Sequence, residues 1–211
     1  MSTELKQQAP STEEQVVVVI DDDLDIRLSM VELLESSGIR STAFGDALDF
    51  VENGCLEAPG CIVLDVNLPR ISGMEFQCRL AELGCDLPIV FVTGHADVPM
   101  SVTAMKAGAI DFLLKPFSNR QLLEAVMKAF ETNRCSRQSA LQRNAIKENA
   151  STLTPREKQV MHHVTNGLMN KQIAYALGIS EIMVKIHRAN VMHKMEASSL
   201  ADLVKKSELL C

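Results

Sequence analysis

The first part of the chain alternates short apolar runs with segments in which apolar residues recur at helical spacing. The run Val16–Ile20 is β-branched throughout, and residues 24–37 place leucine and valine mostly three or four positions apart. Four further pairs follow, with expected strands at 39–44, 61–64, 88–92 and 109–114 and expected helices at 47–52, 73–83, 98–107 and 119–132. Buried parallel strands that alternate with helices predict a doubly wound α/β fold with a five-stranded sheet.

The last part of the chain has no strand pattern. A hydroxyl cap and a first-turn proline, Thr154 and Pro155, predict the start of a helix that ends at Gly167. Further helices are expected at 171–177, 181–195 and 200–209, and the tight turn 178–180 indicates a helix-turn-helix. Between the two parts, the polar stretch 132–151 is either a rigid helix or a flexible tether. We therefore expect a first domain at 15–133, a linker at 134–150 and a small all-α domain at 151–211.

The charge is unevenly distributed between the two parts. A net charge of −6 argues weakly against a nucleic-acid partner, because binding phosphates requires clustered lysine and arginine. However, residues 1–150 contain 13 basic and 22 acidic residues, whereas residues 151–211 contain 8 basic and 5 acidic residues. The opposite signs indicate two domains with different partners, of which the helical domain suits nucleic acid.

The apolar runs are far shorter than the roughly 18 residues that a membrane span needs. The N-terminus lacks a basic and apolar signal region, so we expect a cytoplasmic protein with no membrane partner. The six cysteines form no C-x-x-C pair, and we expect reduced structural thiols. They are Cys55, Cys61, Cys78, Cys85, Cys135 and Cys211.

Polar residues follow the expected strands where the carboxyl ends of parallel strands meet. Asp21 and Asp22 follow the first strand, and Asp65, Thr93 and Lys115 stand at the ends of the third, fourth and fifth. Three crowded carboxylates repel one another unless a cation lies among them, and oxygen ligands favour Mg²⁺. Asp65 is the natural nucleophile toward phosphorus, which would form an acyl phosphate, while the Thr93 hydroxyl and the Lys115 ammonium contact phosphoryl oxygens.

Two alternatives apply to these acidic residues. Any one of them could serve only as a helix cap or turn residue, although the combination argues against this. Calcium is the second alternative, because Asp21, Asp23, Asp25 and Glu32 fall at positions 1, 3, 5 and 12 of an EF-hand loop. The calcium alternative fails because Ile26 stands where the loop needs glycine, and because a strand, not a helix, precedes it.

A helical wheel of residues 181–195 separates two faces. Val184, Val191 and Met195 form a stripe that we expect to be core. The residues opposite form an apolar face flanked by Lys185 and Lys194, which suits the major groove of DNA. They are Ile182, Ile186, Ala189, Asn190 and His193. In the alternative interpretation, Ile182 and Ile186 pack on a neighbouring helix and the lysines only solvate the surface. For the adjacent pair His162 and His163 we expect a structural role.

Four segments in this order resemble a response-regulator receiver domain, which is flavodoxin-like. They are VIDDD at 19–23, LDVNLP at 64–69, VTGH at 92–95 and KAGAIDFLLKPF at 106–117. Residues 151–211 resemble the LuxR-type helix-turn-helix, through MVKIHRANV at 183–191 and scaffold residues at 157, 167, 170, 171, 173, 174 and 177. The combination resembles the NarL/FixJ family, closest to its FixJ branch. The resemblance implies a two-component response regulator whose phosphorylation controls transcription.

The resemblance also implies roles for residues of the first domain. Asp65 would accept the phosphoryl group from a cognate histidine kinase. Mg²⁺ would be held by Asp21, Asp22, Asp65 and the backbone carbonyl of Asn67. Thr93 and Phe112 would form a switch pair, whose face promotes a homodimer on phosphorylation. Lys115 would contact the phosphoryl group, and the bond from Lys115 to Pro116 would be cis. Because phenylalanine replaces the frequent tyrosine at position 112, the switch would act through packing.

In the helical domain, the resemblance implies that Lys185, Ile186 and Ala189 face bases of double-stranded promoter DNA. His187, Asn190 and Lys194 would contact phosphates or pack, and Met183 lacks the hydroxyl of the usual threonine. Arg188 remains open between a packed stem and a phosphate contact.

Two other classes of function compete with a non-enzymatic regulator. A phosphatase with an aspartyl intermediate would need a carboxylate two residues after Asp65, where Asn67 stands. An adaptor would use the helical domain to bind only protein.

Overall fold

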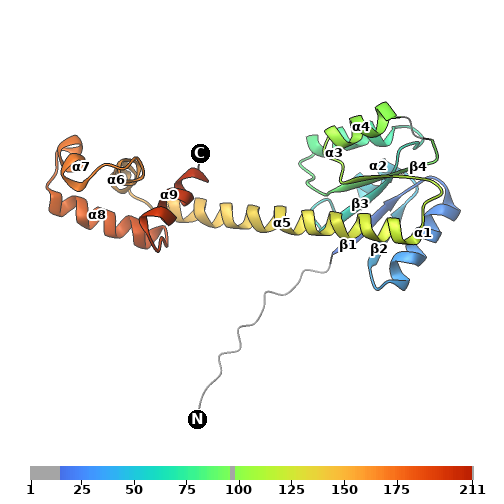
Figure 1. Ribbon diagram of the computed structural model, residues 1–211, viewed down its shortest axis with the longest axis horizontal. Helices are drawn as coiled ribbons and strands as arrows, with labels where there is room; N and C mark the ends of the chain where they lie inside the picture. The colour runs from blue at the N-terminus through green and yellow to red at the C-terminus, as the bar shows by residue number, and fades with distance from the viewer. Residues whose placement is uncertain (1–14, 96–97, 211) are drawn as a thin grey trace, which may run out of the picture. The chain divides into compact units, whose positions relative to one another are not determined.

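The structure is a computed structural model that describes residues 15–95 and 98–210. The chain divides into two compact units, one that ends at Ser136 and one that begins at Arg137 (Figure 1). No helix within the described ranges is both long enough and apolar enough to cross a membrane.

The first unit is built around one parallel sheet. Its elements are β1 (Val16–Ile20), α1 (Leu24–Ser36), β2 (Arg40–Phe44), α2 (Ala47–Asn53), β3 (Gly60–Asp65), α3 (Gly73–Glu82), β4 (Ile89–Thr93), α4 (Val98–Lys106), β5 (Asp111–Leu114) and α5 (Asn119–Ser151). The strand order is β2-β1-β3-β4-β5, and every neighbouring pair is parallel. The predicted doubly wound fold is confirmed. Since β1 lies between β2 and β3, the strand order reverses at β1, where ligands bind in folds of this class.

Helices cover both faces of this sheet (Figure 1). Helices α2, α3 and α4 pack on one face through Phe50, Phe76 and Ala104, among other residues. Helices α1 and α5 pack on the opposite face, where Leu34 and Val126 are fully buried. Every residue of β3 is buried, because its successive side chains enter the two cores alternately. The strand that carries Asp65 is therefore held between two packed layers.

The second unit contains α6 (Pro155–Thr165), α7 (Asn170–Leu177), α8 (Glu181–Lys194) and α9 (Leu200–Glu208). Helices α7 and α8 are joined by the turn that begins at Gly178, which has a left-handed φ of +64° and ends α7. Val184, Val191 and Met195 are buried in the core of this unit, as the helical wheel predicts. The expected helix-turn-helix arrangement is present.

The connector is helical. Residues 119–132 were expected to form a helix followed by a polar connector, but α5 continues to Ser151. Residues 119–151 contain neither glycine nor proline and are rich in good helix formers, so the helix continues past residue 132, where the buried apolar stripe of its first part has ended. Asn133 is buried and its Oδ1 accepts a hydrogen bond from Gly60 N at 3.1 Å, which ties this part of α5 to the first unit. Ile146 packs in the core of the second unit, so that core begins before residue 151.

The described cysteines form no disulfide bonds. Cys61 and Cys85 are buried, and burial raises the pKa of Cys61 to about 12, which suits an unreactive core thiol. Cys55, Cys78 and Cys135 are exposed, and Cys211 lies outside the described residues.

The second unit holds a buried carboxylate, Glu157, at the start of α6. It closes a capping box with Thr154 and accepts a hydrogen bond from Lys194 Nζ at 2.7 Å. The bond from Lys194, together with the backbone N–H of Thr154, lowers the pKa of Glu157 from 4.5 to about 2. Glu157 therefore links α6 to the end of α8 as an ionised group.

Replacing Glu157 with glutamine is expected to lower the free energy of unfolding of the second unit by about 1.5–3 kcal/mol, the usual value of hydrogen bonds to charged groups. Because the pKa of Glu157 is lower in the folded state, its stabilisation is fully present above pH 4.5 and is lost as the pH falls toward 2. The difference in the free energy of unfolding between wild type and E157Q should therefore decrease as the pH falls from 4.5 toward 2. Urea unfolding of the full chain, with hydrogen exchange of α6 and α8 peptides, measures both effects.

Glu181→Gln is the matched control, because Glu181 is an exposed glutamate on α8. It should change stability by less than about 0.5 kcal/mol. Equal effects of the two substitutions would contradict a special role for Glu157.

Candidate functional site

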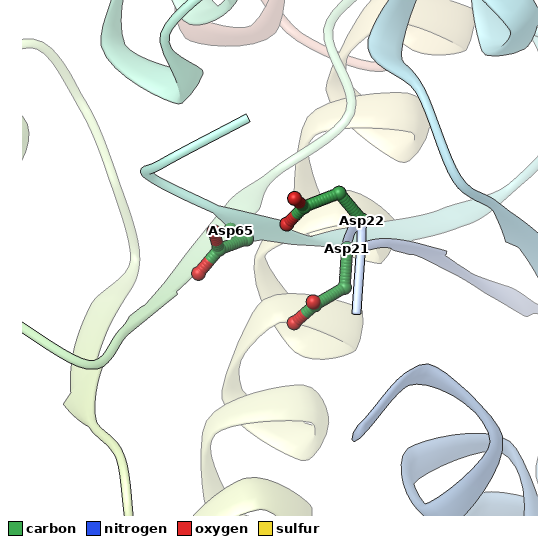
Figure 2. Close-up of side chains that lie close together, drawn as sticks. All are labelled: Asp21, Asp22 and Asp65. Atoms are coloured by element: carbon green, nitrogen blue, oxygen red, sulfur yellow. The ribbon is translucent and has the colours of Figure 1, made fainter. Parts of the chain in front are cut away.

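Three carboxylates meet at the carboxyl edge of the sheet, beside the point where the strand order reverses. Asp21 and Asp22 follow β1 and Asp65 ends the neighbouring strand β3, as Figure 2 shows. Each offers an oxygen atom that lies within 4.8 Å of the others. Asp21 and Asp65 are buried, whereas Asp22 is exposed, so the cluster opens to solvent on one side.

Lys115 lies between the two buried carboxylates. Its Nζ is 2.6 Å from Asp21 Oδ2 and 3.0 Å from Asp65 Oδ1. Burial alone would lower the pKa of Lys115, but its hydrogen bonds to Asp21 and Asp65 outweigh this and raise the pKa. Burial raises the pKa of Asp21, although the hydrogen bond from Lys115 opposes that shift. Three carboxyl groups therefore lie around one ammonium, and acidic side chains outnumber the basic one within the cluster.

Backbone and side-chain contacts hold the two buried carboxylates in place. Asp21 Oδ1 accepts from Asp23 N at 3.0 Å, and Asp65 Oδ2 accepts from Asn67 N at 3.0 Å. Arg27 Nη1 donates to the backbone oxygen of Asp21, a contact that the sequence pattern did not indicate. At Gly73, a Cβ atom would lie 2.4 Å from the Asp65 backbone oxygen, so glycine allows α3 to start against the strand. The Lys115–Pro116 bond is cis, as expected.

Thr93 lies next to this cluster and is fully buried. Its Oγ1 donates to the backbone oxygen of His95 at 3.0 Å and accepts from Asn67 Nδ2 at 3.1 Å. The second contact was missed in the sequence, where Asn67 was assigned only a backbone role. Phe112 is partly buried, and its ring centroid lies 6.1 Å from that of Phe91.

Helix α8 presents an exposed apolar face in the second unit. Ile182 and Ile186 are 70% and 48% exposed, so the alternative in which they pack on a neighbouring helix is wrong. Lys185, Ala189, Asn190 and His193 are also exposed. Lys185 flanks the exposed face, and the other five residues lie opposite the buried stripe of α8.

The remaining polar residues of α8 have contacts within the unit. Lys194 Nζ bonds Glu157 and also the backbone oxygen of Thr152 at 3.1 Å, which favours the packing alternative over a phosphate contact. Arg188 Nη1 donates to Asn170 Oδ1 at 3.1 Å, so its stem packs against α7. His187 is partly buried, and its Nδ1 has no hydrogen-bond partner among the described residues.

Within residues 15–95 and 98–210, Asp21, Asp22 and Asp65 form the one group of three or more His, Cys, Asp or Glu side chains close enough to share a metal ion. His162 and His163 belong to no such group. Their rings meet edge to face with centroids 5.6 Å apart, which fits the expected structural role.

Comparison with known families accounts for both units. Residues 17–127 match the model of the response regulator receiver domain. Residues 151–207 match the model of the bacterial regulatory proteins of the luxR family.

The chain is also similar to complete regulators. It is 47% identical to nodulation protein W of Bradyrhizobium diazoefficiens over 195 residues, which cover 92% of this chain and 86% of the relative. It is 43% identical to the transcriptional regulatory protein FixJ of Azorhizobium caulinodans, with 92% of each chain covered. Its fold matches the response regulator StyR with a TM-score of 0.81 and 44% identity, over 92% of this chain and 98% of that one. The chain therefore belongs to the NarL/FixJ family of two-component response regulators, in the FixJ branch, with a receiver unit followed by a LuxR-type helix-turn-helix.

Proposed function

We propose that Asp65 is the phosphoacceptor of this regulator and that a histidine kinase is the donor. The observation that supports this most directly is the group of three carboxylates within 4.8 Å, in which Lys115 bridges Asp21 and Asp65. One oxygen of Asp65 attacks the phosphorus of the phosphohistidine. A P–O bond forms as the P–N bond breaks, and the imidazole leaves with its electron pair.

The donor set suits Mg²⁺. The side-chain oxygens of Asp21, Asp22 and Asp65, with the backbone carbonyl of Asn67, would hold it, and a cluster of oxygen ligands in which carboxylates outnumber the lysine suits a divalent cation. When bound, Mg²⁺ neutralises phosphoryl oxygens. Lys115 is placed to contact another of them, since its Nζ already lies 3.0 Å from Asp65 Oδ1. The Thr93 hydroxyl would supply a third contact after leaving its present partners.

The same geometry disfavours a phosphatase. That activity needs a general acid two residues after the nucleophile, and Asn67 instead uses its amide to bond Thr93. We therefore assign a regulatory phosphorylation to this chain.

We further propose that phosphorylation controls binding to double-stranded promoter DNA through α8. Lys185, Ile186 and Ala189 would read bases, and Asn190 and His187 would contact the backbone, because the exposed face of α8 has an apolar centre and a basic edge. The switch of Thr93 and Phe112 would change the face made by α4, β5 and α5, and so favour a homodimer on two half-sites. The domain bounds that we propose are 15–133 and 151–211, with a linker at 134–150.

The phosphoacceptor assignment predicts that Asp65→Asn abolishes phosphorylation. An amide lacks the anionic oxygen that attacks phosphorus, so incorporation of label from radiolabelled acetyl phosphate should fall at least a hundredfold. Wild-type incorporation should require Mg²⁺ and stop when EDTA is added.

Asp86→Asn is the control, because Asp86 is an exposed carboxylate that precedes β4, away from the carboxyl edge. It should incorporate label as wild type does. Normal labelling of D65N would show that another residue accepts the phosphoryl group.

The DNA interface predicts that Lys185→Ala combined with Ile186→Ala abolishes selective retention of a promoter fragment. The loss of one good base contact costs about 1–3 kcal/mol, or roughly 5- to 150-fold in affinity. Electrophoretic mobility shifts at two salt concentrations would measure this, and wild-type binding should weaken as salt rises.

The matched control is Lys205→Ala with Leu209→Ala, which removes the same charge and another exposed aliphatic side chain, around α9. It should retain the fragment. If wild type retains no DNA in either phosphorylation state, the helical unit is a protein-binding adaptor instead.

A further inference from the structure

Asn67 contacts both the phosphoacceptor and the switch threonine. Its backbone N–H donates to Asp65 Oδ2 at 3.0 Å, and its side-chain Nδ2 donates to Thr93 Oγ1 at 3.1 Å. The backbone contact would exist with any residue except proline at this position. The second contact depends on a side-chain donor, and position 67 supplies one.

The hydroxyl of Thr93 has no spare hydrogen-bonding capacity in this arrangement. A hydroxyl has one proton and two lone pairs. The proton of Thr93 goes to the backbone oxygen of His95, and its oxygen accepts from Asn67 Nδ2 and from His95 N, at 3.3 Å. Because Thr93 is fully buried, a hydroxyl that loses these partners without gaining others carries a desolvation penalty.

Thr93 must leave these partners before its hydroxyl can bond a phosphoryl group on Asp65. The bonds to His95 are made by its backbone atoms, so a substitution at position 67 removes neither partner. The bond from Asn67 is the one contact of the three that a side-chain substitution removes. Asn67 itself is exposed, so its removal leaves no buried cavity and should have little effect on the stability of the fold.

We infer that Asn67 is a positioning residue that holds the resting rotamer of Thr93 and thereby sets how readily the receiver enters its phosphorylated conformation. This inference rests on the proposed function, since it assumes that Thr93 moves toward Asp65. A residue that stabilises only the resting state opposes the switch by the value of its bond, which for a typical hydrogen bond corresponds to about a three- to tenfold change in equilibrium.

The test is a double-mutant cycle on the full chain, with beryllofluoride and Mg²⁺ as the probe. The variants are Asn67→Ala, Thr93→Val and the double variant, and bound beryllofluoride is measured by fluorine NMR. N67A should bind beryllofluoride about three- to tenfold more tightly than wild type. In the T93V background, where no hydroxyl remains to be held, N67A should change the affinity less than twofold.

An equal effect of N67A in both backgrounds would overturn the inference, because Asn67 would then act on the phosphoryl site directly. Weaker or unchanged binding by N67A in the Thr93 background would overturn it as well. Asn53→Ala is the matched control, since Asn53 is an exposed asparagine at the end of α2, and it should bind as wild type does.

A second measurement needs no phosphoryl mimic. Methyl NMR of Thr93 in the unphosphorylated full chain reports the populations of its χ1 rotamers. In N67A we expect Thr93 to populate more than one χ1 rotamer. An unchanged Thr93 rotamer in N67A would overturn the inference even if Asp65 is phosphorylated. If wild type binds no beryllofluoride and accepts no phosphoryl group, the proposed function fails, and the rotamer still decides whether Asn67 holds Thr93.

Discussion

Two buried carboxylates at the ends of neighbouring strands are the constraint on which the receiver unit depends. Parallel pairing of β1 with β3 brings the end of one strand beside that of the other, so Asp21 and Asp65 repel each other across the carboxyl edge. Lys115, from the end of β5, contacts both and offsets part of this repulsion. One ammonium cannot neutralise two ionised buried carboxylates and the adjacent Asp22, so the edge suits a cation, which would reduce the repulsion that remains.

The packing of the sheet makes this repulsion tolerable. Every residue of β3 is buried between two helical layers, so Asp65 cannot move away from Asp21 without disrupting both cores. Gly73 contributes at the same place, because the backbone of α3 approaches Asp65 where a side chain would collide. The packed strands and helices therefore preorganise the cluster in the absence of a ligand, as is typical of binding sites built on rigid elements.

Features set by backbone topology could be predicted from the sequence, whereas contacts set by side-chain pairing could not. Asp21, Asp65 and Lys115 could be placed together because parallel strands share a carboxyl edge, whatever the loops do. The bond between Asn67 and Thr93 depends on a loop conformation that has no periodic signal. Lys194 stands at the edge of the exposed face on a helical wheel, which cannot show that Glu157 of another helix binds it. The continuation of α5 to Ser151 lacks an apolar stripe, so hydrophobic periodicity could not reveal it.

The buried acidic groups of the two units differ in how fully their negative charge is offset by neighbouring groups. Glu157 accepts hydrogen bonds from Thr154 and from Lys194, and these bonds stabilise its negative charge and lower its pKa. Asp21 shares its lysine with Asp65, and burial raises its pKa despite that contact. A carboxylate whose negative charge is already offset by hydrogen bonds and a lysine is stabilised little by a further cation. The receiver cluster keeps an excess of acidic side chains at an edge open to solvent, so a cation bound there would reduce the repulsion among its carboxylates.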